Sequence, residues 1–240
     1  MTNHPKITLL SILLFAIVAP KFLWSQDLCP NQIELLHALN APVVQVNLGL
    51  NDEGLRYSLQ KQTDLSFCPG PVKLNGQFQL NNKAFSTLIV MGGKCDDSTG
   101  ISNERAYSSH VLVRSKDVLI NAHHQLLING HLVHEDSVIL FIQNLSLEFF
   151  WKYEYRLVAY SVQWENEVSQ SFREQIVQDI IQGFLMAADS VSERLYQKSV
   201  CQLSSEEVKT LKKDFQFALV LDKPAPLPPP PRKRMPEIKD

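Results

Sequence analysis

Between Phe172 and Leu195 the apolar side chains return at steps of three and four residues, so they share one face of a helix. That face holds Phe172, Ile176, Val177, Ile180, Ile181, Phe184, Leu185, Ala188, Val191 and Leu195. Ser171 and Glu174 have the spacing of a capping box, which satisfies unpaired backbone N–H groups at the start of a helix. The pattern predicts a long helix over 172–197 that packs against a β-sheet.

Much of the chain before this helix alternates apolar and polar residues, which is the pattern of β-strands. Two such runs, 44–50 and 55–59, flank the turn-like sequence Asn51–Gly54 and predict a β-hairpin. Asn75 and Gly76 form a dipeptide typical of tight turns, so the runs on either side of it predict a second hairpin. Further strands are expected at 86–91, 110–113, 117–120, 125–128, 131–133, 157–162 and 215–221.

Two patterns meet between Ser137 and Tyr155. Residues 138–142 are all apolar, which fits either a helix or a buried strand. From Leu145 to Tyr155 large apolar and aromatic residues occupy every second position, which is the spacing of a strand.

These elements together predict an α+β fold. It has an antiparallel, β-rich sheet, one long amphipathic C-terminal helix, a short second helix and a final strand; Ser204 and Glu207 have capping-box spacing at the second helix. The chain divides into a β-rich N-terminal region at 27–105 and an α+β region at 106–222, which can form one domain with the preceding part. Residues 223–240 form a proline-rich basic tail.

The first 26 residues have the order of a secretory signal: a short basic start, an apolar run over 7–19 and a break at Pro20. A helix that crosses a bilayer needs about 20 apolar residues, and this run ends earlier. The pattern favours cleavage after Ser25 or Gln26 and a periplasmic or secreted location. The alternative is an uncleaved anchor, in which residues 7–24 hold the protein on the membrane.

All four cysteines follow the apolar run, and an even number of cysteines in an exported chain indicates disulfides. Three pairings are possible. Cys68 and Cys95 flank one hairpin-rich segment, while Cys29 and Cys201 lie near the two ends of the folded region, so these two pairs are favoured. Each bridge is expected to contribute about 3 to 4 kcal/mol to stability. Four buried free thiols are the alternative.

A formal net charge of −2 argues against a dedicated nucleic-acid binder. The chain contains no GxSxG, HExxH, Walker-type or dinucleotide-type glycine motif and no CxxC pair. The sequence therefore names no catalytic residue and no cofactor, and it leaves an enzymatic role open.

Four histidines gather near one predicted hairpin, His123 and His124 in one turn and His131 and His134 beyond the next. Imidazoles are ligands for zinc or copper, so this hairpin is a candidate metal site. The two turns lie about 17 Å apart, at roughly 3.4 Å per strand residue, which argues against one site built from all four. Exposed turn and edge histidines are the interpretation that the pattern favours.

The C-terminal tail combines a run of prolines with a basic triplet: Pro228, Pro229, Pro230, Pro231, Arg232, Lys233 and Arg234. An extended polyproline segment of this kind can dock on a protein partner or touch anionic lipid. A solvated tail is the alternative that the sequence favours, because the segment has little to bury.

Residues 111–133, with the strand-turn-strand run that begins at Asp117, resemble the periplasmic domain of the ExbD/TolR biopolymer-transport family. In that family a similar hairpin is followed by a helix, a strand, a longer helix and a terminal strand. The stretch Tyr196–Val208 and the strand that ends at Leu221 are similar to the tail of longer members. The resemblance covers the C-terminal half of the chain and implies a helix over 135–146.

Two features depart from the family pattern. Family members carry an aspartate in the membrane helix that couples to proton flow, whereas residues 7–24 contain no acidic side chain. The region 30–105 has no counterpart in the usual family layout. The resemblance therefore implies a divergent envelope component without the motor chemistry.

The leading hypothesis is an exported, non-enzymatic cell-envelope protein that acts as a binding or accessory module for a protein partner. The competing hypothesis is a secreted metal-binding protein or hydrolase that uses the histidine-rich hairpin. No nucleic-acid partner is expected, and membrane association is expected if residues 7–24 stay attached.

Overall fold

The computed structural model describes residues 28–37, 41–63, 72–80, 83–91, 115–153 and 156–221. The expected signal, the strand at 110–113 and the tail at 223–240 lie outside these residues, as do Cys68 and Cys95. In the ranges just given, no helix is both long and apolar enough to cross a membrane.

The described part of the chain contains both helices and strands. The strands are β1 (Val43–Gln45), β2 (Val72–Leu80), β3 (Lys83–Met91), β4 (Lys116–Ile120), β5 (Leu126–Ile128), β6 (His131–Val133), β7 (Leu157–Trp164) and β8 (Gln216–Leu221). The helices are α2 (Pro30–Leu36), α3 (Asp52–Thr63), α6 (Val138–Tyr153), α7 (Gln170–Tyr196) and α8 (Ser205–Asp214), with the short 3-10 helices η3 (Glu135–Ser137) and η4 (Val200–Gln202).

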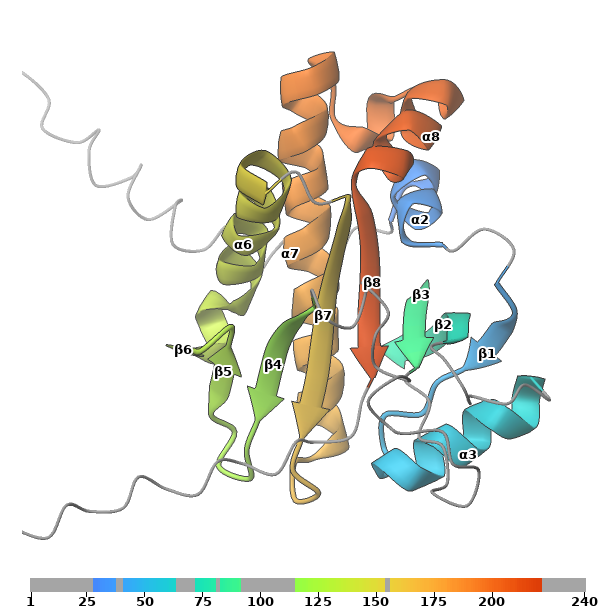
Figure 1. The fold of residues 1–240 in the computed structure, drawn as a ribbon, viewed down its shortest axis with the longest axis vertical. Coiled ribbons are helices and arrows are strands. Elements are labelled where there is room, and N and C mark those ends of the chain that lie inside the picture. The colour runs from blue at the N-terminus through green and yellow to red at the C-terminus, as the bar shows by residue number, and fades with distance from the viewer. Residues whose placement is uncertain are drawn as a thin grey trace, which may run out of the picture.

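One sheet contains all the strands that the structure describes, in the order β1-β2-β3-β8-β7-β4-β5-β6 (Figure 1). Its central strands β3, β8, β7 and β4 are parallel, and β2 and the β5–β6 hairpin add antiparallel pairs on either side. The predicted α+β class is confirmed, but the prediction of an antiparallel sheet is wrong. Parallel neighbours need a crossover connection, and α6 and α7 provide it from β4 to β7 and from β7 to β8.

Helices α6 and α7 cover one face of the sheet, and α2 packs beside β3, β8 and α8 (Figure 1). On α7, the ring of Phe184 lies 4.9 Å from that of Phe215 and 4.7 Å from that of Phe217. Arg173 of α7 is buried and donates from Nη1 to the Leu48 carbonyl at 3.0 Å. The N-terminal region therefore shares both the sheet and the helix layer of the C-terminal region.

Helix α3 occupies the segment for which a strand at 55–59 is predicted. Leu55 and Leu59 are buried, whereas Tyr57 between them is 68% exposed. Residues four apart lie on one face of a helix, and this burial follows that spacing rather than the alternation. The predicted hairpin of 44–50 with 55–59 is therefore wrong.

Asn75 and Gly76 lie in the middle of β2, so the prediction of a turn at this dipeptide is also wrong. β2 pairs antiparallel with β3 along its whole length, from Val72 opposite Met91 to Leu80 opposite Lys83. A Cβ on Gly76 would collide with the side chain of Ile89 on β3. Glycine is present here because the side chain of Ile89 lies too close for a Cβ, and not because the backbone turns.

Helix α6 replaces the strand predicted from Leu145 to Tyr155. Trp151 and Tyr153 at its end are 39% and 45% exposed, so the alternating residues do not share one buried face. The buried residues follow helical steps instead: Val138, Ile142, Leu145, Ser146 and Phe149.

Helix α7 begins with a different cap from the predicted one. The Oγ of Ser169, not that of Ser171, accepts a hydrogen bond from the backbone N–H of Phe172 at 3.3 Å. The capping box predicted for the second helix is present at α8. The Ser204 N–H donates to Glu207 Oε2 at 2.7 Å, and the Glu207 N–H donates to Ser204 Oγ at 3.4 Å.

Gly183 lies at a close contact between α7 and α6. A Cβ at this position would lie 2.6 Å from the carbonyl oxygen of Ile139 and 2.7 Å from the Cβ of Ile142. The Ile139 oxygen is a backbone atom, so a Cβ at position 183 fits only if α6 moves as a whole. The contact between the two helices therefore depends on glycine.

Gly183→Ala is expected to lower the free energy of unfolding by about 2 kcal/mol, since overpacking costs more than the helix propensity of alanine returns. Urea unfolding followed by circular dichroism measures the change. Gly54→Ala in α3 is the matched control, because the nearest atom there is the end of the Asn51 side chain. Equal effects of the two substitutions would contradict the tight helix contact.

Candidate functional site

The strands β4, β5 and β6 have one face in the core and one face turned away from the helices. The core face consists of Val118, Ile120, Leu126, Ile128 and Val133. Alternate residues of a strand point to opposite faces, so Leu119, Leu127 and Leu132 lie on the other side. Leu127 is 38% and Leu132 74% exposed. The second face thus presents large apolar side chains to solvent.

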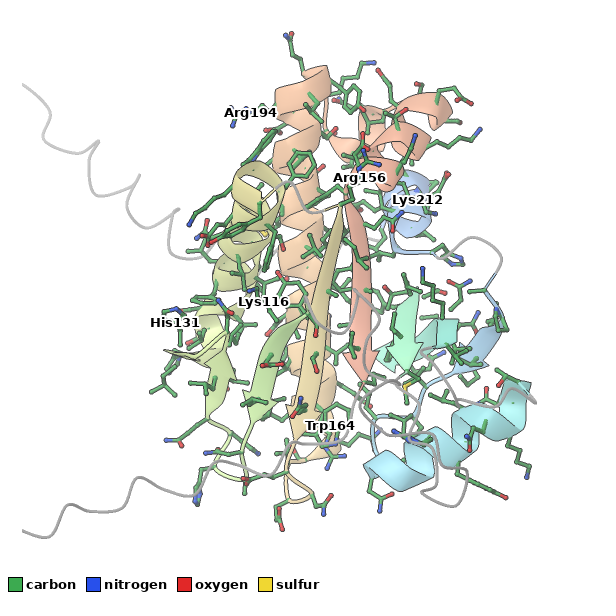
Figure 2. All side chains as sticks on the ribbon, viewed as in Figure 1. Lys116, His131, Arg156, Trp164, Arg194 and Lys212 are labelled. Carbon is green, nitrogen blue, oxygen red and sulfur yellow. A yellow bond between two sulfur atoms is a disulfide. The ribbon has the colours of Figure 1, made fainter. Side chains whose placement is uncertain are left out.

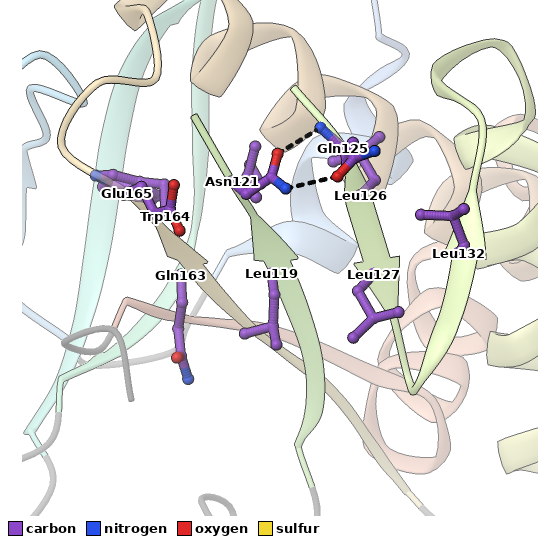
Figure 3. A pocket seen from close by; sticks show the side chains of 10 residues that line it. Leu119, Asn121, Gln125, Leu126, Leu127, Leu132, Gln163, Trp164 and Glu165 are labelled. Atoms are coloured by element: carbon purple, nitrogen blue, oxygen red, sulfur yellow. Dashed lines mark hydrogen bonds between the residues drawn. The ribbon is translucent and has the colours of Figure 1, made fainter. Parts of the chain in front are cut away.

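The strand register aligns these side chains into one row across four strands (Figure 3). Gln163 of β7 pairs with Leu119, Leu119 pairs with Leu127, and Leu127 pairs with Leu132. We call these four residues the hairpin surface. They line a pocket of about 240 Å³, whose other lining residues are Ile120, Asn121, Gln125, Leu126, Trp164 and Glu165.

A polar network bounds one end of this pocket (Figure 3). Asn121 Oδ1 accepts from the backbone N–H of Gln125 at 2.9 Å, and Asn121 Nδ2 donates to Gln125 Oε1 at 2.8 Å. Glu165 Oε2 accepts from the backbone N–H of Ala122 at 2.6 Å. These bonds hold the β4–β5 turn against the end of β7, so the hairpin surface is preorganised for binding.

Strand β6 ends the sheet, and no strand of the described ranges pairs with its outer edge. An unpaired edge offers backbone N–H and C=O groups to an incoming chain. The hairpin surface and this edge together supply apolar contacts and directional hydrogen bonds. This combination is suited to binding another polypeptide chain.

The structure separates the four histidines of the candidate metal site. His123 and His124 lie in the β4–β5 turn, where the His124 ring stacks on Phe172 with 4.2 Å between centroids. His131 begins β6, and His134 caps η3. Across the described part of the chain, no group of three His, Cys, Asp or Glu side chains could hold a metal ion.

Cys29 and Cys201 form a disulfide with 5.8 Å between their Cα atoms, which is the pairing that the sequence favours. Beside it, Asn31 Nδ2 donates to the carbonyls of Val200 and Leu203, each at 2.9 Å. The start of α2 is therefore fastened to η4 by one covalent bond and two hydrogen bonds. The expected partner-binding residues of the tail and the other cysteine pair lie outside the described residues.

Asp179 is an acid in the interior, 6% exposed, on the side of α7 that faces the start of α6. Its pKa is raised from the ordinary value of 3.8 to about 7, chiefly by burial and in smaller part by the charges of Glu135 and Asp136. A hydrogen bond from Gln175 Nε2, 2.9 Å from Asp179 Oδ1, acts in the opposite direction. The carboxyl is therefore held near its titration point at neutral pH.

Sequence reasoning singled out neither the hairpin surface nor Asp179. The alternation in β4 and β5 indicated two faces, but strand register was needed to align the leucines. A glycine inside a helical pattern often marks close packing of another element. Gly183, four residues after Asp179, therefore indicated that a second element packs against this part of the helix. Comparisons of this chain with protein-family models, with curated proteins and with solved structures found no match.

Proposed function

We propose that this protein is an exported, non-enzymatic cell-envelope protein that binds a protein partner through the hairpin surface. One observation carries the proposal: the row Leu119, Leu127 and Leu132 crosses the sheet toward the outer edge of β6. Full burial of an exposed leucine contributes roughly 1.5 to 3 kcal/mol, so Leu132 supplies most of the contact energy and the half-buried Leu127 a smaller part. The edge of β6 orients the partner.

Export is supported by the signal-like order of residues 1–26 and by the cysteines. The Cys29–Cys201 disulfide fits an oxidising compartment such as the periplasm or the exterior, where such bonds persist. A divergent accessory component of the envelope is the role that fits both features.

Kinship with the ExbD/TolR periplasmic domain is part of the proposal. From β4 onward the chain forms a hairpin, helix α6, strand β7, the longer helix α7 and, after α8, the terminal strand β8. This order, and α6 in particular, supports the layout that the resemblance implies. Strand β3 extends the same sheet beside β8. A shared layout does not carry function, so proton-coupled motor chemistry is not proposed.

A photo-cross-linking residue in place of Leu132 is expected to capture one partner protein in the envelope of the source organism. Adding Leu127→Glu should reduce that adduct roughly tenfold, because a binding loss of about 1.4 kcal/mol is tenfold in affinity. Mass spectrometry of the adducts identifies the partner and measures the reduction.

Leu140 on α6, which is 59% exposed, provides the matched control as a cross-linking site. It has comparable exposure but lies outside the hairpin surface, so little or no specific adduct is expected there. Equal capture at positions 132 and 140, or an adduct that Leu127→Glu leaves unchanged, would reject the hairpin surface as the docking site.

The competing function, a metal-binding protein or hydrolase, would use His123, His124, His131 and His134. No observation among the described residues favours it. Metal analysis of the purified protein separates the two classes, since a stoichiometric metal that is lost on His131→Ala would overturn the binding-module proposal.

A further inference from the structure

The last turns of α6 and α7 expose several large apolar side chains at one end of the molecule. Trp151 is 39% exposed, Tyr153 45% and Leu195 48%. Two cationic side chains lie among them. We call this set the Trp151 surface: Trp151, Lys152, Tyr153, Arg194 and Leu195.

The cations of this surface lie over its aromatic rings. The guanidinium of Arg194 is 4.2 Å from the centroid of the Trp151 ring, and Lys152 Nζ is 4.9 Å from that of Tyr153. Cation–π contacts of this kind hold the charged groups over one face of each ring and fix the rings in place. The result is a surface on which aromatic rings and cations are paired.

The N-terminal part of the described chain is fastened at the same end. The Cys29–Cys201 disulfide places residue 29 beside η4, which follows the end of α7 by three residues. Lys212 of α8 donates to the Glu34 carbonyl of α2 at 2.5 Å. Figure 2 shows Lys212, Arg156 and Arg194 toward one end and Trp164 toward the other. The chain that precedes residue 28 therefore enters the fold at the end that carries the Trp151 surface.

Only four peptide units separate Trp24, the end of the expected anchor at 7–24, from Leu28, and they span at most about 14 Å. If residues 7–24 stay in a bilayer, Leu28 lies within that distance of the lipid headgroups, and the Trp151 surface lies at the same end of the fold as Leu28. Trp and Tyr rings bordered by Arg and Lys are typical of the headgroup region.

We propose that the Trp151 surface rests on the headgroup region of the phospholipid bilayer in which residues 7–24 are anchored. The inference rests on the export that the proposed function assumes and on the uncleaved anchor, which is the alternative to the cleavage that the sequence favours, but not on partner docking, which uses a different surface. Acidic groups lie nearby, with Glu148 2.9 Å from Lys152 and Asp214 3.9 Å from Arg156. Net positive charge is therefore not the source of binding, and the rings provide the contact.

The test uses the full chain in lipid nanodiscs, with a photo-cross-linking residue at position 151, 195, 57 or 132 in separate samples. Tyr57 on α3 is the matched control, because it is 68% exposed and α3 lies toward the other end of the fold from α2 and α8 (Figure 1). Mass spectrometry is expected to find roughly tenfold more lipid adduct at 151 and 195 than at 57, in phosphatidylcholine alone and in mixtures with phosphatidylglycerol.

Equal lipid adducts at 151 and 57 would overturn the proposal, as would an adduct at 151 to a second copy of the chain. A chain isolated from the envelope with a free N-terminus near Gln26 would overturn it too, because the tether is then gone. Position 132 distinguishes this proposal from the proposed function. It should give no lipid adduct here, and its capture of a protein in cells does not depend on the outcome at 151.

Discussion

Replacement of both Cys29 and Cys201 by serine is expected to lower the free energy of unfolding by about 4 to 5 kcal/mol, because the bridge closes a very long loop. The two cysteines are 172 residues apart. Without the bond the unfolded chain gains the freedom of that whole loop, while Asn31 keeps its hydrogen bonds to η4 in the folded state. Guanidinium unfolding measures the loss.

A double substitution is needed, because a reducing agent would act on Cys68 and Cys95 as well. The variant with serine at those two positions is the matched comparison. If they are bridged as the sequence favours, the shorter loop predicts a smaller loss of about 3 to 4 kcal/mol. A loss below about 1 kcal/mol on removal of Cys29 and Cys201 would contradict the expected role of their bond.

The C-terminal half shows where local sequence determines structure. The alternation around Leu119 and Leu127 indicates strands β4 and β5, and the turn at Asn129 and Gly130, which both have positive φ, specifies the β5–β6 hairpin. The apolar stripe of α7 is equally clear because it is long. In such segments the apolar residues follow either the strand spacing or the helix spacing, but not both.

Local sequence was ambiguous where two periodicities coincide. In α6 eleven of sixteen residues are apolar or aromatic, so residues two apart and residues three or four apart both form rows, and the helix is selected by packing against α7. In α3 the positions of Leu55 and Leu59 fit both a strand and a helix. Asn75 and Gly76 have the sequence of a turn, but the pairing of β2 with β3 runs through them.

The candidate site depended on long-range information. Leu119, Leu127 and Leu132 come from three strands, and only their register makes a row that is shared with Gln163. The mixed sheet could not be predicted for the same reason. The crossover that makes β4 and β7 parallel passes through α6, the segment whose local pattern indicated a strand, whereas the crossover from β7 to β8 passes through α7.

Asp179→Asn is expected to make the protein about 2 to 4 kcal/mol more stable at pH 8 and to change its stability little near pH 4. Burial raises the pKa of Asp179 to about 7 in the folded protein, from an ordinary value of 3.8. The folded state therefore holds this proton more tightly than the unfolded state does. Its stabilising effect is complete at low pH and is lost as pH rises from about 4 to about 7.

Asparagine keeps the shape of the side chain and an oxygen that can accept from Gln175 Nε2, but it carries no charge to bury beside Glu135 and Asp136. Urea unfolding at a series of pH values measures the difference between variant and wild type. Asp117→Asn makes the same chemical change at an exposed position and should alter stability by less than about 0.5 kcal/mol. If Asp179→Asn gave the same difference at pH 4 and pH 8, the carboxyl would not be buried as the α6–α7 contact requires.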